Sequence, residues 1–139
     1  MLSNLEQQQV AEAIAAAEQK TSGEIRVHME NLCTEDPMKR AIAVFEKLGM
    51  QRTAARNGVL IYVALQSNQL AIIGDKGINE QVPSDFWNST RDLMIQHFQK
   101  GQITSGLCAA ITEAGAQLAA YFPHDNNDQN ELTNDISFG

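Results

Sequence analysis

Three oxygen-bearing side chains, far apart in the sequence, could act together on a metal ion. Glu24 and Asn57 each stand at the start of a segment with the pattern of a β-strand, and Asp75 stands at the end of a third. If the first two strands are parallel and the third is antiparallel to its neighbour, the three residues share one edge of a sheet. Two carboxylates and an amide oxygen, with backbone carbonyls from Gly74 to Gly77, are hard ligands of the kind that Ca2+ or Mg2+ accepts. The sequence therefore predicts a divalent-cation site at this edge.

Simpler roles for the same residues remain open. Asn57 precedes a glycine and forms a common turn pair, and Asp75 can cap a local turn. Glu24 can form a surface ion pair with Lys76 or Arg56.

The opposite edge of the sheet is a competing position. In open α/β sheets, ligands usually bind beyond the carboxyl ends of the parallel strands. The polar residues expected there are Glu30, Glu35, Asp36 and Ser67. His28 and His97 have no Ser, Cys or Asp partner at a recognisable spacing, so no catalytic triad is predicted.

A second oxygen-rich set lies towards the end of the chain. It comprises Asp125, Asn127, Asp128, Asn130 and Glu131, of which Asp128 and Glu131 are candidate calcium ligands. The set lacks the glycine and the spacing of an EF-hand loop, so a solvated acidic terminus is the alternative. Residues 124–139 are expected to form an acidic tail that either frays or docks through Ile136 and Phe138.

The elements that must position these residues alternate between strand and helix. Residues 24–30 alternate apolar and polar, residues 59–65 form a continuous apolar run, and residues 69–73 follow after a three-residue turn. Helices are expected over 3–20, 36–49, 83–101 and 103–121. The strand–helix–strand order predicts a right-handed parallel crossover, and the short turn predicts an antiparallel hairpin.

Composition limits the possible partners. The formal net charge of −7 argues against nucleic acid, which needs clustered Lys and Arg. Cys33 and Cys108 lack metal or redox spacing and indicate reduced thiols in a cytoplasmic protein. No apolar run approaches the length of a membrane span or a signal peptide, so we expect a soluble protein without a membrane partner.

Four segments of the chain resemble the TPM domain family. They are Thr21-Ser22-Gly23-Glu24-Ile25, Asn57-Gly58-Val59-Leu60-Ile61, Ile73-Gly74-Asp75-Lys76-Gly77 and residues 101–107. The resemblance implies a compact α/β/α sandwich with a small mixed sheet and a Rossmann-like core over residues 1–123. A thylakoid member associated with photosystem II repair is described as binding calcium and as an acid phosphatase. Many relatives have a membrane anchor or signal peptide and an extra first strand, which we do not expect here.

Two functions follow as hypotheses. The favoured one is a calcium-binding domain that holds Ca2+, or Mg2+, through Glu24, Asn57 and Asp75, with a second ion ordered by the tail. The alternative is a metal-dependent acid phosphatase acting on phosphomonoesters, with Arg56 or Lys76 neutralising the phosphate. The chain has no phosphatase nucleophile motif of its own, so no catalytic residue is assigned, and the sequence names no protein partner.

Overall fold

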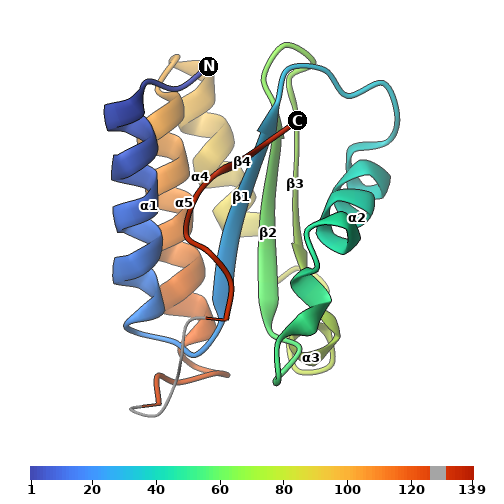
Figure 1. The fold of residues 1–139 in the computed structure, drawn as a ribbon, viewed down its shortest axis with the longest axis vertical. Coiled ribbons are helices and arrows are strands. Elements are labelled where there is room, and N and C mark those ends of the chain that lie inside the picture. Colours follow the sequence, from blue (N-terminus) through green and yellow to red (C-terminus); the bar gives the residue numbers. More distant parts are fainter. Residues whose placement is uncertain (126–130) are drawn as a thin grey trace. The chain divides into compact units, whose positions relative to one another are not determined.

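The computed structural model of the chain describes residues 1–125 and 131–139. These residues form two compact units, each made of two separate stretches of sequence. The first unit combines Met1–Gly23 with the stretch that begins at Pro83, and the second combines Glu24–Val82 with residues 131–139. The second unit holds the sheet, and Figure 1 shows its last strand lying beside its first.

The sheet has the order β3-β2-β1-β4 within the described residues. Its strands are β1 (Glu24–Glu30), β2 (Gly58–Ala64), β3 (Gln69–Gly74) and β4 (Ser137–Phe138). β1 and β2 are parallel, β2 and β3 form the expected antiparallel hairpin, and β4 runs parallel to β1. The expected α/β class with a small mixed sheet is confirmed. The tail was expected either to fray or to dock through Ile136 and Phe138, and residues 137–138 dock on β1. Strand β4 itself was not predicted, because two residues are too few to show a strand pattern.

Helix α2 (Pro37–Lys47) covers one face of this sheet. The Asp36 carboxylate accepts a hydrogen bond from the Lys39 N–H (3.1 Å), and Pro37 occupies the first helical position, where its missing N–H has no cost. One side of the helix is apolar and joins a single buried cluster with β2 and β3: Ala41, Val44, Phe45, Met50, Leu60, Tyr62, Ala64 and Ala71. Burial of this face stabilises the helix against the sheet.

Two short helices shape the edge of the sheet where β1 begins. A 3-10 helix, η1 (Met50–Arg52), follows Gly49, which has a left-handed φ of 70°. Helix α3 (Lys76–Asn79) follows β3 directly and begins at the cap residue Asp75. Helix η1 lies just before β2 in the chain, and α3 lies just after β3. Because the start of β2 pairs with the end of β3, both short helices belong to this edge of the sheet.

The first unit consists of α1 (Asn4–Glu18), α4 (Asn88–Gln99) and α5 (Ile103–Leu118). Helix α5 packs against both α1 and α4. Ser3 and Glu6 form a reciprocal capping box at the start of α1, and the Thr104 hydroxyl donates to the Glu6 carboxylate (2.7 Å). The prediction of a helix starting at Pro83 is wrong, because residues 83–87 form turns and α4 begins at Asn88.

A polar link joins the far ends of α1 and α5. The Thr21 hydroxyl donates to the Phe122 carbonyl, and the Ser22 N–H donates to the same carbonyl (3.0 Å). Thr21 also forms a β-bridge with Pro123. In residues 1–125 and 131–139, no helix is long and apolar enough to cross a membrane.

Candidate functional site

The three residues predicted to share an edge of the sheet lie in register across it. Glu24 is opposite Gly58, and its N–H donates to the carbonyl of Asn57 (3.2 Å). The Asp75 N–H donates to the carbonyl of Gly58 (2.9 Å) on the other side of β2. Glu24, Asn57 and Asp75 are 2%, 2% and 6% exposed. The topology therefore brings all three to one edge, with β2 between Glu24 and Asp75.

Asp75 is already held by other groups of this chain. Its carboxylate accepts from Arg56 Nε (2.8 Å) and Nη2 (2.9 Å), which is a bidentate ion pair. It also accepts from the Lys76 N–H (2.7 Å) and so caps α3. Hydrogen bonding to Asp75 raises the pKa of Arg56. Asp75 therefore serves as a helix cap and an ion-pair partner, as one of the simpler interpretations expected.

Glu131 joins the same edge from the end of the chain. Its N–H donates to Oε1 of Glu24 (2.7 Å). Its carboxylate accepts from the N–H of Ala54 (3.2 and 3.4 Å), just before β2. The backbone of Glu131 is thus joined to the carboxylate of Glu24, 107 residues away in the chain. We call the set Glu24, Asn57, Asp75 and Glu131 the amino-end rim.

The amino-end rim fits a hard cation in the kind of donors it supplies. Carboxylate, amide and backbone carbonyl oxygens at this edge are the kinds of donor that Ca2+ accepts. Within the described part of the chain, however, no three Asp, Glu, His or Cys side chains are close enough to hold a metal. Asp128 lies outside the described residues. Lys76 is exposed, and its Nζ lies 3.9 Å from the Glu80 carboxylate.

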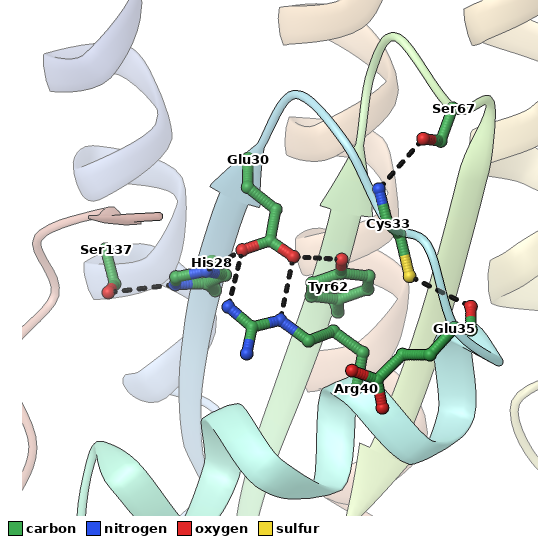
Figure 2. Close-up of polar contacts among 8 residues, drawn as sticks. All are labelled: His28, Glu30, Cys33, Glu35, Arg40, Tyr62, Ser67 and Ser137. Atoms are coloured by element: carbon green, nitrogen blue, oxygen red, sulfur yellow. Dashed lines mark hydrogen bonds and ion pairs between the residues drawn. The ribbon is translucent and has the colours of Figure 1, made fainter.

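A second polar cluster lies at the carboxyl end of β1, where ligands of α/β sheets usually bind (Figure 2). Its centre is the Glu30 carboxylate, which is 5% exposed. Glu30 accepts from Arg40 Nε and Nη2 (2.9 Å each), from the Tyr62 hydroxyl, and from His28 Nε2 (3.2 Å). His28 Nδ1 lies 3.0 Å from the Ser137 hydroxyl oxygen. We call these five residues the Glu30 network.

The electrostatics of the Glu30 network fix its protonation at neutral pH. Hydrogen bonds from Arg40 are the main reason that the pKa of Glu30 falls to about 2, so Glu30 is ionised and accepts only. Burial lowers the pKa of His28, so its ring is neutral. Nε2 of His28 must therefore carry the proton that faces Glu30, and Nδ1 accepts the hydrogen bond of the Ser137 hydroxyl. Burial also raises the pKa of Tyr62, which stays protonated.

The other residues expected at the carboxyl end have structural roles. Ser67 Oγ accepts from the Cys33 N–H (2.8 Å), and Cys33 Sγ donates to the Glu35 carbonyl (3.2 Å). The first bond holds the loop after β1 against the turn after β2, and the second lies within that loop, as Figure 2 shows. Asp36 caps α2.

Sequence reasoning placed Glu30 at this end but missed its partners. The spacing of His28 and Glu30, two residues apart on one strand, does place them on one face. Arg40 and Tyr62 carried no comparable signal, and Ser137 lies 109 residues from His28.

Comparisons with known proteins address the fold. The family model described as the TPM domain matches residues 1–117. The NMR structure of the BA42 protein from the psychrophilic bacterium Bizionia argentinensis is 45% identical, with a TM-score of 0.94, and covers 100% of this chain and 96% of that one. Comparison with the sequences of curated proteins gave no significant match.

Two more distant solution structures share the fold alone. The N-terminal domain of a protein from P. gingivalis is 18% identical, with a TM-score of 0.73, over 91% of this chain and 82% of that one. The N-terminal domain of the cg2496 protein from Corynebacterium glutamicum is 12% identical, with a TM-score of 0.67, over 98% and 80%.

Proposed function

Because the chain belongs to the TPM domain family, we propose that it is a divalent-cation-binding domain that holds Ca2+ at the amino-end rim. The observation that supports this proposal is the hydrogen bond from the Glu131 N–H to the buried Glu24 carboxylate. This bond brings a second acidic residue, Glu131, next to the buried carboxylate of Glu24. A cation there reduces the repulsion between two negative charges.

The donor set favours Ca2+ over Mg2+. Ca2+ accepts six to eight oxygen ligands in flexible geometry, including amide and backbone carbonyl oxygens, whereas Mg2+ demands a near-ideal octahedron. Glu24 and Glu131 would hold the ion, with Asn57 as the amide donor. Asp75 would join only by exchanging its ion pair with Arg56 for the metal. We therefore assign Asp75 a smaller part in binding than Glu24 and Glu131.

The test is a titration of the full chain with CaCl2 and with MgCl2. Binding is monitored through the NMR chemical shifts of the backbone amides and through thermal unfolding. Binding to the folded state alone stabilises it by RT ln(1 + [L]/Kd), which is about 2.7 kcal/mol at a hundred times Kd. We expect saturable shifts at residues 24, 54, 57 and 131 and a rise in the melting temperature Tm. Glu24→Gln and Glu131→Gln should each remove the response. Glu46→Gln changes an exposed acid of α2 and should keep it.

Unchanged shifts at millimolar calcium would exclude the proposed site. The phosphatase alternative uses Arg56 and Lys76 as phosphate-binding groups, and Arg56 must first leave Asp75 to serve in this way. Assay of a phosphomonoester with the wild type and with Asp75→Ala separates the two functions. Turnover above buffer that is lost in Asp75→Ala would replace the binding proposal with the catalytic one.

A further inference from the structure

Residues 131–139 lie along β1 and contact its polar side chains one after another. The polar residues of β1 are Glu24, Arg26, His28 and Glu30, at every second position, and therefore on one face. Glu131 bonds to Glu24, and Ser137 bonds to His28. Between these two points, Arg26 and Asp135 interact electrostatically. The contacts follow the same direction in both segments, because β4 is parallel to β1.

The last residue of this segment fits only as glycine. The Gly139 N–H donates to the Met29 carbonyl (2.9 Å) and continues the parallel pairing. A Cβ at Gly139 would overlap the Glu30 carboxylate and lie 2.8 Å from His28 Nε2. The Glu30 carboxylate cannot turn aside easily, because Arg40 and Tyr62 bind both of its oxygens. The polar side of β1 therefore selects a small residue two positions after the serine.

The segment contributes little to the fully buried core. Leu132 packs, partly buried, against the cluster of α2, β2 and β3, but none of residues 131–139 is fully buried, β4 has only two residues, and Phe138 is 44% exposed. Such a segment, with little buried apolar area, opens at a lower free energy than the core of its unit. Opening would expose the backbone donors and acceptors on the free edge of β1, which can pair with another extended chain.

We propose that the polar side of β1 is a binding site for an extended peptide, which residues 131–139 fill within the chain. Its partner in trans is a protein segment with the pattern Asp-x-Ser-x-Gly, read from Asp135, Ser137 and Gly139. Arg26 attracts the acidic residue, His28 Nδ1 accepts from the serine hydroxyl, and the Glu30 network leaves room only for glycine. The backbone of the peptide pairs in parallel with β1, as in other cases of strand addition.

The test uses the full 15N-labelled chain carrying Gly139→Ala, which should expel its own segment. The probe is the peptide of residues 131–139 with acetyl and amide ends, added in EDTA so that the result is independent of cations. We expect this peptide to restore the amide shifts of His28 and Met29 saturably. The wild-type chain, whose own segment competes, should need at least about tenfold more peptide. The matched control is the same peptide with Gly139→Ala, which should not bind.

Several results would overturn the proposal. If the His28 and Met29 amides of the Gly139→Ala chain keep the chemical shifts of the wild-type chain, the segment is still docked and the site does not select glycine. Equal binding of the two peptides would show the same, and failure of the wild-type peptide to restore the shifts would exclude binding in trans. If the variant does not fold, the wild-type chain supplies the answer. Millimolar peptide should then shift the Ser137 and Phe138 amides away from their docked positions, and unchanged amides would contradict the proposal.

Discussion

A single buried carboxylate organises the carboxyl end of β1. Glu30 is 5% exposed, yet three side chains donate hydrogen bonds to it, and one of them carries a positive charge. A buried ion is tolerated when a counter-ion and further hydrogen bonds replace the lost water. Removal of one partner leaves the remaining buried polar atoms without a hydrogen bond and without water. Substitutions in the Glu30 network should therefore lower the free energy of unfolding.

Tyr62→Phe tests the hydrogen bond from the phenol to Glu30. The substitution keeps the buried ring, which lies 6.0 Å from the His28 ring and nearly parallel to it, and removes only the hydroxyl. We expect the free energy of unfolding to fall by about 1–2 kcal/mol, measured by urea denaturation. Tyr121→Phe is the control, because that ring is 37% exposed, and it should change stability very little. Equal effects of the two substitutions would contradict this assignment.

Acid should destabilise the protein in two steps. Burial lowers the pKa of His28 below 6.5, so the unfolded chain binds more protons there, and stability falls as the pH drops below 6.5. Glu30 has a pKa of about 2 when folded and 4.5 otherwise, so its contribution is complete above about 4.5 and is lost towards pH 2. Thermal unfolding across this range should show both slopes.

Two variants test whether His28 causes the loss of stability that begins below pH 6.5. His28→Asn should flatten the dependence of Tm on pH just below 6.5 while leaving the lower step in place. His124 is exposed, and His124→Asn should keep the wild-type profile. A profile that survives in His28→Asn would show that another group produces the upper step.

At the scale of elements, the close contact between α3 and the strand connection before β2 depends on Gly77. A Cβ at this position would overlap the Ala55 carbonyl and lie 2.7 Å from the Arg56 carbonyl oxygen, both of which are backbone atoms. Gly77→Ala must therefore move α3 or residues 55–56, which carry the partner of Asp75. We expect a loss of about 1–3 kcal/mol in the free energy of unfolding, measured in urea.

The neighbouring Lys76→Ala is the control for this substitution. Lys76 is exposed, and its loss should change stability by less than about 0.5 kcal/mol. A neutral Gly77→Ala would mean that the backbone carbonyls of residues 55 and 56 shift without cost.

The sequence predicted most of the sheet because its signals are local. The apolar run of β2 and the three-residue turn before β3 determine the hairpin, and Asp36 with Pro37 marks the start of α2. From this topology, the shared edge of Glu24, Asn57 and Asp75 followed correctly. The hydrogen-bond partners of these residues could not be predicted from the topology. The ion pair between Arg56 and Asp75, for example, depends on how one loop folds beside α3. The contacts of Glu131 and Ser137 join segments more than 100 residues apart, which no local pattern encodes.

At the scale of the whole molecule, the net charge of −7 should make stability depend on salt. Excess like charge repels itself in the compact state, and added salt screens this repulsion. Raising NaCl from about 0.02 to 0.3 M should increase Tm by roughly 2–5 °C. The matched variant carries lysine at Glu12, Glu46 and Asp92, all exposed, and has a formal charge of −1. It should show a smaller rise, and an equal rise would contradict this explanation.

Each compact unit is assembled from stretches that lie far apart in the chain, and this order bears on synthesis. The ribosome releases α1 about 70 residues before it releases the start of α4. Strand β1 likewise emerges long before β4. A nascent chain therefore holds early elements whose companions do not yet exist, and factors that shield growing polypeptides would meet α1 before α5 and the edge of β1 before β4.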